Sequence, residues 1–171
     1  MTFYAPEPLT ADHHTSGFSC GVHSLDTWLQ DKARKNAVSG ASRTFVVVDD
    51  HDVVIAYYAL STGALERGGL PTRLQRNTPS SIPVLVLGRF AVDIRHQGEG
   101  VGRSMLMDAL IRCERVGIEA GFMFVVVHPV DDVAASFWKR WGFIDAPTTP
   151  PALILPLAAL RDISVRLAGT Q

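Results

Sequence analysis

A run of three glycines, Gly98, Gly100 and Gly102, is the feature that most constrains how this chain can fold. The run separates an apolar segment, residues 84–92, from an amphipathic segment that begins near Val101. A short apolar run before glycines is typical of a buried strand, and apolar residues at helical spacing after them are typical of a helix. We therefore predict a strand, a tight glycine turn and a helix, in that order.

The predicted turn is suited to hold a phosphate group, although it could also be a tight turn without a ligand. Glycines leave the backbone bare, and the start of the following helix carries partial positive charge, so an anion can approach the N–H groups. A Walker loop needs Lys and then Ser or Thr, but Gly102 is followed by Arg103. A Rossmann turn needs a sixth-position glycine, which counted from Gly98 is again Arg103. Neither signature fits.

The other segments alternate between helical and strand patterns. We expect an irregular start with a possible edge strand, then one amphipathic helix over residues 24–38, with Ser24 as N-cap and Gly40 as stop. A hairpin of 44–48 and 53–60 follows, then a long loop over 62–83 with a helical turn near 70–76, and a strand over 82–93. After the glycines we expect the helix from Val101 to Gly121, a strand over 122–128, a helix capped by Asp131 and ended by Gly142, a last strand from Phe143 and 152–157, and a short or frayed helix from Leu160. This order predicts a mixed α/β sheet with the glycine turn near its middle.

Length and composition favour one globular domain over residues 1–171, with 47% hydrophobic residues to build a core. No apolar run is long enough to span a membrane, and no signal sequence precedes the domain, so we expect a cytoplasmic protein. Two distant cysteines make a disulfide framework unexpected. We expect no metal, because His13, His14, Cys20 and His23 match no common zinc spacing.

Basic residues gather in two windows of a chain whose net charge is only −1. Residues 32–48 and 67–92 each hold four basic side chains and no acid. The net charge argues against a surface that coats nucleic acid in general. The windows are compatible with a polyanionic partner on one face, or else with solvated surface arginines.

The spacing Gln97-x-x-Gly100-x-Gly102 resembles the cofactor loop of the GNAT acetyltransferases, and the order of elements resembles that fold over nearly the whole chain. The resemblance implies that acetyl-CoA binds with its pyrophosphate on the loop amides and its pantetheine arm on the strand before them. The cofactor-binding residues that it implies are Phe90, Ala91, Val92, Gln97, Gly98, Glu99, Gly100, Val101, Gly102, Arg103 and Phe137.

A narrower resemblance, to the acetyltransferase toxins of bacterial type II toxin–antitoxin modules, covers five stretches: residues 24–29, 43–48, 60–63, 76–77 followed by 82–84, and 89–93. It implies acetylation of the α-amine of an aminoacyl-tRNA, which blocks translation. It also implies a ribbon-helix-helix antitoxin and a homodimer. The basic windows would then bind tRNA through Lys32, Lys35, Arg43, Arg73, Arg76 and Arg89.

The catalytic position departs from these toxins. They carry Phe-Tyr before a Gly-Phe pair, and the tyrosine is taken as the general acid, whereas this chain has Phe137 and Trp138. An indole N–H cannot supply a proton near neutral pH. Ser136, Tyr58 or a bound water could replace the acid, or Trp138 only packs. Two alternatives therefore stay open: a GNAT enzyme for a small-molecule or protein amine, and a catalytically weak module that binds CoA or an antitoxin.

Overall fold

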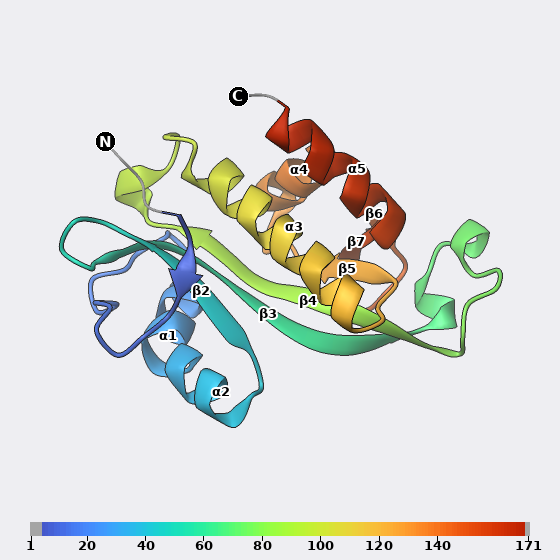
Figure 1. Ribbon diagram of the computed structural model, residues 1–171, viewed down its shortest axis with the longest axis horizontal. Helices are drawn as coiled ribbons and strands as arrows, with labels where there is room; N and C mark the ends of the chain where they lie inside the picture. Colours follow the sequence, from blue (N-terminus) through green and yellow to red (C-terminus); the bar gives the residue numbers. More distant parts are fainter. Residues whose placement is uncertain (1–4, 170–171) are drawn as a thin grey trace. The chain divides into compact units, whose positions relative to one another are not determined.

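The computed structural model describes residues 5–169 as a mixed sheet flanked by helices (Figure 1). Within this described part of the chain, seven strands are joined in the order β1-β2-β3-β4-β5-β7-β6. The strands are β1 (Glu7–Pro8), β2 (Arg43–Val48), β3 (Val54–Glu66), β4 (Ser81–Val92), β5 (Phe124–Val127), β6 (Ile144–Ala146) and β7 (Ala152–Pro156). Because β4 leads into the glycines and is fourth of seven, the predicted mixed sheet with the turn near its middle is confirmed.

The helical elements connect these strands along the chain or, in the case of α5, follow the last one. They are α1 (His23–Asp31), α2 (Ala33–Ser39), α3 (Val101–Glu119), α4 (Asp132–Arg140) and α5 (Leu157–Ala168), with the short 3₁₀ helices η1 (Arg67–Gly69), η2 (Thr72–Leu74) and η3 (Ile94–His96). None of the helices described here is both long and apolar enough to cross a membrane.

The described chain divides into two compact units. The first unit runs up to Ser61 and includes Arg89–Ala109, and the second consists of Thr62–Gly88 and the chain from Leu110 onward. The long strands β3 and β4 and the helix α3 each contribute to both units. The prediction of one domain over residues 1–171 stays a prediction.

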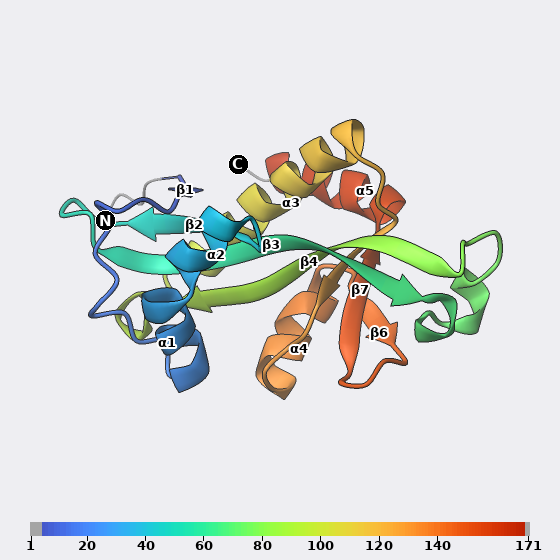
Figure 2. The same cartoon turned by 90° about the horizontal axis from the view of Figure 1, so that it is seen from below.

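In the first unit, two adjacent tyrosines on β3 show how helices cover opposite faces of the sheet. Successive strand residues point to opposite faces. The hydroxyl of Tyr57 donates to the Leu25 carbonyl of α1 at 2.6 Å, and its ring stacks on Trp28 with centroids 5.9 Å apart. The hydroxyl of Tyr58 instead donates to the carboxylate of Asp108 on α3. Helix α1 therefore lies on one face and the start of α3 on the other (Figure 2).

The core of the first unit lies under α1. Buried apolar side chains from the segment before α1, from α1 and α2, and from β2, β3 and β4 pack together there: Phe18, Leu25, Leu29, Ala33, Val46, Val48, Val54, Tyr57 and Ala91. Burial of a large apolar side chain contributes roughly 1.5–3 kcal/mol. This cluster fixes α1 against the strands.

The second unit is built on β5, which pairs in parallel with β4 and antiparallel with β7. The edge strand β6 pairs antiparallel with β7. One face carries a core of Leu70, Ile82, Val84, Phe124, Val126, Ala146, Ala152 and Ile154. The predicted cap of α4 is confirmed, because the carboxylate of Asp131 accepts from the Ala134 N–H at 2.8 Å. Gly142, with φ +95°, follows the end of α4 as predicted.

The single helix predicted over residues 24–38 is wrong. The chain forms α1 and α2, separated at Lys32, whose φ of −117° departs from helical geometry. Ser24 is not the N-cap either, because α1 already begins at His23 and follows Val22, which makes no side-chain cap. The predicted stop at Gly40 is confirmed by its left-handed conformation, with φ 83°.

The predicted long loop over 62–83 is shorter than expected, because β3 continues to Glu66 and β4 begins at Ser81. A Cβ at Gly63 would lie 3.0 Å from a Val86 methyl carbon, so the absence of a side chain lets the two strands approach closely. Pairing thus outweighs the low strand propensity of this segment. The predicted helical turn is confirmed as η2, and the last strand is two strands, β6 and β7. The tail is α5, which begins at Leu157.

Candidate functional site

The glycine turn is an exposed loop whose backbone is open to a ligand. Gly98 and Gly100 have φ of +80° and +84°, a conformation that glycine adopts without steric cost. A Cβ built at either position would meet no atom within 4 Å. The space beside both residues is therefore free of described protein atoms, as a site for a bulky anion requires.

Helix α3 begins directly after this loop. Its first i→i−4 hydrogen bond runs from the Ser104 N–H to the Gly100 carbonyl, at 3.2 Å. The N–H groups of residues 101–103 precede this bond, as in the first turn of any helix. With 19 residues, α3 adds a helix dipole whose positive end lies at the loop. The arrangement fits a pyrophosphate.

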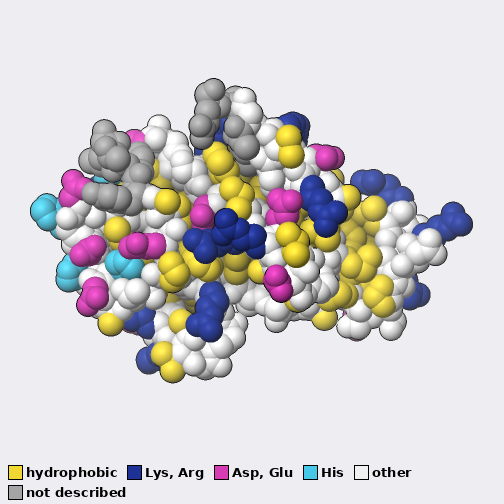
Figure 3. All heavy atoms as spheres, in the orientation of Figure 1, with side chains coloured by type: hydrophobic (Ala, Val, Ile, Leu, Met, Phe, Trp, Pro, Cys, Tyr) yellow, Lys and Arg dark blue, Asp and Glu magenta, His cyan; other side chains and the backbone are white. Residues whose placement is uncertain are grey.

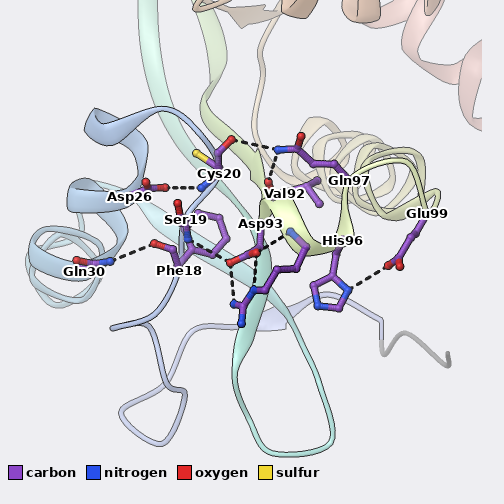
Figure 4. A network of polar contacts seen from close by, with 11 residues as sticks. Phe18, Ser19, Cys20, Asp26, Gln30, Val92, Asp93, His96, Gln97 and Glu99 are labelled. Carbon is purple, nitrogen blue, oxygen red and sulfur yellow. Dashed lines mark hydrogen bonds and ion pairs between the residues drawn. The ribbon is translucent and has the colours of Figure 1, made fainter.

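A buried aspartate anchors the approach to this loop (Figure 4). The Asp93 side chain is fully buried, and its carboxylate accepts from Arg95 at 2.8 and 2.9 Å, from the Arg95 N–H at 3.0 Å and from the Ser19 N–H at 3.1 Å. The Asp93 N–H donates to the Ile55 carbonyl at 2.8 Å. The end of β4 is thereby tied to β3 and to the N-terminal segment.

The charge of Asp93 is stabilised in the folded state. Burial by itself would raise the pKa of this carboxyl, but the hydrogen bonds from Arg95 and Ser19 and the charge of Arg95 outweigh burial and lower the pKa to about 2. Asp93 is therefore ionised at every physiological pH.

The loop residues Gln97 and Glu99 use their side chains within the protein (Figure 4). The amide of Gln97 donates to the carbonyls of Val92 and Cys20, at 2.9 and 3.1 Å. A carboxylate oxygen of Glu99 lies 3.0 Å from Nδ1 of His96. In this arrangement these two side chains shape the loop, and their contribution to an anion would come from the backbone.

The strand before the loop runs past its pairing with β5. The parallel register extends from Val84↔Phe124 to Val86↔Val126, whereas β4 itself continues to Val92. Phe90, Ala91 and Val92, predicted to bind the pantetheine arm, lie in this later part of β4. Of the other predicted cofactor residues, Val101, Gly102 and Arg103 form the first turn of α3, and Phe137 lies on α4 in the second unit.

The three candidates for the proton donor have different environments. Tyr58 is fully buried in the first unit and donates its hydroxyl proton to Asp108. Ser136 is exposed on α4 of the second unit. Trp138 is 4% exposed on the same helix and makes edge contacts with Phe137 and Phe143, at centroid distances of 5.2 and 5.1 Å. The role of each as an acid stays a prediction.

The predicted tRNA-binding residues fall into two groups, all with exposed side chains. Lys32, Lys35, Arg43 and Arg89 belong to the first unit, and Arg73 and Arg76 belong to the second, on or next to η2. Figure 3 shows basic side chains around the loop that carries η1 and η2, and acidic and histidine side chains near the turn between β2 and β3. Their binding of tRNA stays a prediction.

Sequence reasoning missed the anchor formed by Ser19, Asp93 and Arg95. The Asp-x-Arg spacing of residues 93–95 is a signal for a capped turn, because an aspartate readily accepts from the N–H two residues on. Nothing local pairs Ser19 with Asp93, which are 74 residues apart. The short helix η3, which Asp93 caps, was not among the predicted elements either.

No group of three His, Cys, Asp or Glu side chains that could hold a metal occurs within residues 5–169. His13 has a structural partner, since its Nε2 lies 2.7 Å from a Glu7 carboxylate oxygen. Burial and the neighbouring Asp26 raise the pKa of the Cys20 thiol to about 11, and burial raises that of Cys113 to about 12. Neither cysteine is thus poised as a nucleophile.

Comparison with known proteins agrees with this geometry. The family described as acetyltransferase (GNAT) matches residues 10–143. The chain is 37% identical over 161 residues to the tRNA-acetylating toxin of Mycobacterium tuberculosis, an alignment that covers 94% of this chain and 96% of the relative. It is 28% identical to the probable toxin TacT of Sinorhizobium fredii, over 92% of this chain and 93% of the relative.

Solved structures show the same fold. A crystal structure of a tyrosine-to-phenylalanine mutant of KacT superposes with a TM-score of 0.88 at 25% identity, over 95% of this chain and 99% of the other. AtaT complexed with acetyl-methionyl-tRNAfMet gives a TM-score of 0.86 at 25% identity, with the same coverage. AtaTR bound with acetyl-CoA gives 0.82 at 26% identity, over 94% and 97%. The predicted fold class is confirmed.

Proposed function

This chain belongs to the GNAT acetyltransferase family, and we propose that it is a toxin that transfers the acetyl group of acetyl-CoA to the α-amine of an aminoacyl-tRNA. The observation that carries the proposal is the similarity, along almost the whole chain, to a tRNA-acetylating toxin. A modified α-amine can no longer attack a peptidyl ester, so the product is lost to translation.

The glycine loop supports acetyl-CoA as the donor. Gly98 and Gly100 leave an open cradle, and the start of α3 provides N–H groups and positive potential for the pyrophosphate. The backbone of Phe90, Ala91 and Val92 would hold the pantetheine arm and the thioester. When bound, acetyl-CoA supplies an activated acetyl group, and a solved relative of the same fold contains it.

The acceptor amine needs little help from a base. An unperturbed α-amine has a pKa of roughly 7.7–8.0, so a useful fraction is neutral at cellular pH. The task of the protein is then to position this amine and to stabilise the charge that develops on the thioester oxygen, for which a backbone N–H of β4 is suited. The amine nitrogen gains the acetyl group and loses a proton, and the sulfur of CoA leaves as thiolate.

Protonation of the leaving thiolate is the step for which this chain is least equipped. Trp138 stands where the resembling toxins carry tyrosine, and a positioned general acid typically contributes about 10²–10⁴-fold. Loss of the tyrosine slows the reaction without abolishing it. We therefore propose a slow enzyme in which water or Ser136 supplies the proton.

We also propose partners and a location for this protein. A ribbon-helix-helix antitoxin, a homodimer and a place in the cytoplasm follow from the resemblance to toxin–antitoxin modules. Co-expression with a small upstream reading frame would test the first of these, and sedimentation of the purified protein would test the second.

Acceptor preference tests the proposed function. The protein is given acetyl-CoA with charged tRNA, with the same tRNA after deacylation, with the free amino acid and with a lysine-rich peptide. We expect release of free CoA with charged tRNA alone. Turnover with the amino acid or the peptide would instead identify a GNAT enzyme of different acceptor class. Binding of acetyl-CoA without transfer to any amine would identify the catalytically weak module, which Trp138 would explain.

A further inference from the structure

Three side chains of the first unit form a pile that ends at the protein surface. The Tyr57 ring is fully buried and lies parallel to the Trp28 ring, with 9° between their planes and 5.9 Å between centroids. The Arg89 guanidinium carbon lies 5.2 Å from the Trp28 ring centroid. Trp28 is half-buried and Arg89 is exposed, so the pile runs from the core to solvent.

A hollow of about 190 Å³ opens beside this pile. Its lining consists of Ser24, Thr27, Trp28, Asp31 and Lys32. Residues 24, 27, 28 and 31 recur at the spacing of one helix face, so the floor of the hollow is α1 itself. The lining offers hydroxyls, one carboxylate and one ammonium group next to an aromatic ring.

The pile also adjoins the part of β4 assigned to the thioester. Arg89 immediately precedes Phe90, so their Cα atoms are about 3.8 Å apart, and both lie in the first unit. In any aminoacyl-tRNA the amino acid is esterified to the ribose of the terminal adenosine. The α-amine and the adenine are joined only through the ester and this ribose, so an amine placed at the thioester keeps the adenine in the neighbourhood of this position.

We propose that Arg89 and Trp28 form the platform on which the terminal adenine of the charged tRNA stacks. This inference rests on the proposed function and specifies how its acceptor is held. Arginine planes and aromatic rings are the surfaces on which proteins stack unpaired bases. Asp31 would repel a phosphate in the hollow but can accept from an amino group or a ribose hydroxyl, while Lys32 suits the 5′ phosphate that joins this adenosine to the preceding nucleotide.

The test compares two acceptors that differ only in the adenosine. These are the 3′-aminoacyl ester of adenosine and the methyl ester of the same amino acid. For each, kcat/KM is measured with wild type, with Arg89→Lys, which keeps the charge but loses the plane, and with Trp28→Phe, which narrows the ring. Arg161→Lys on α5 is the matched control, since its side chain is exposed in the second unit.

We expect wild type to favour the adenosine ester by roughly ten- to a hundredfold, as one stacked base would provide. Arg89→Lys should lose most of this preference without changing KM for acetyl-CoA, Trp28→Phe should reduce it, and Arg161→Lys should keep it. Equal kcat/KM for the two esters in wild type, with charged tRNA still acetylated, would overturn the platform and leave the proposed function standing. Acetylation of neither ester nor of charged tRNA would overturn both.

Discussion

The guanidinium of Arg95 closes on the buried carboxylate of Asp93 with two hydrogen bonds, from Nε to Oδ1 at 2.8 Å and from Nη2 to Oδ2 at 2.9 Å. The Ser19 N–H donates to the same carboxylate at 3.1 Å. The point at which β4 ends and the chain turns toward the glycine loop is thus fixed by one ionised side chain, and its loss should be measurable in both stability and cofactor binding.

Asp93→Asn should make the protein less stable and less sensitive to acid. The folded pKa of about 2 lies below the ordinary value of 3.8, so the ionised carboxylate stabilises the fold above about pH 4, and this contribution is lost as the pH falls toward 2. The variant should lose up to about 2 kcal/mol of unfolding free energy at pH 7. Denaturant titrations at pH 7, 4 and 2.5 measure both effects.

Asp162→Asn is the matched control, because Asp162 is exposed on α5. It should leave the unfolding free energy and its pH dependence close to wild type. An Asp93→Asn protein that lost stability with acid as steeply as wild type would show that the anchor does not depend on the charge.

Gly100→Ala should weaken acetyl-CoA binding by at least about tenfold, because a methyl group would stand where the anion approaches the loop. The substitution also forces alanine to a φ of +84°, which costs about 1–2 kcal/mol. Gly40→Ala separates the two effects, since Gly40 has nearly the same φ, +83°, at the end of α2. Calorimetric titration should show weak binding for the first variant alone; equal affinities would refute the loop as the pyrophosphate site.

Trp138→Tyr should raise kcat with charged tRNA, by up to about 10²-fold, if a phenol at this position can protonate the thiolate. Trp138→Phe is the control, since it removes the same bulk from the contacts with Phe137 and Phe143 but adds no hydroxyl. Single-turnover rates of the two variants give the comparison. A fall in rate for both would mean that the indole itself is required.

The sequence predicted most elements of the fold because their signals are local. The apolar run of β4, the glycines that follow and the spacing of apolar residues in α3 all lie within one stretch. The failures have physical causes of longer range. The extension of β3 to Glu66 depends on pairing with a strand that begins 15 residues later, and the break at Lys32 interrupts a helical pattern that continues on both sides.

The site was predictable in outline and not in detail. Glycine spacing identified the loop, but the roles of its side chains depend on distant partners. The Gln97 amide reaches the carbonyl of Cys20, 77 residues away, and the Tyr58 hydroxyl reaches Asp108, 50 residues away. Similarly, only the structure places Arg89 over the Trp28 ring.

Arg76→Ala should raise the apparent KM for charged tRNA several-fold, because the contact of this side chain with a phosphate would be lost. The KM for acetyl-CoA should stay unchanged. Arg161→Ala is the control with an equal change of charge at an exposed position on α5. The salt dependence of tRNA binding adds a second readout. Loss of one phosphate contact lowers by about one the slope of the logarithm of the tRNA binding constant against the logarithm of the salt concentration. Identical slopes in the two variants would exclude Arg76 from the tRNA contact.

Acetyl transfer to charged tRNA is the measurement that decides the account. The protein is incubated with acetyl-labelled acetyl-CoA and a pool of charged tRNA, and label in the RNA is counted before and after mild base, which cleaves the aminoacyl ester. We predict that label enters charged tRNA only, and that mild base releases it as N-acetyl amino acid. Label that stays on the RNA after base, or RNA that acquires none while acetyl-CoA is bound, would contradict the proposed function.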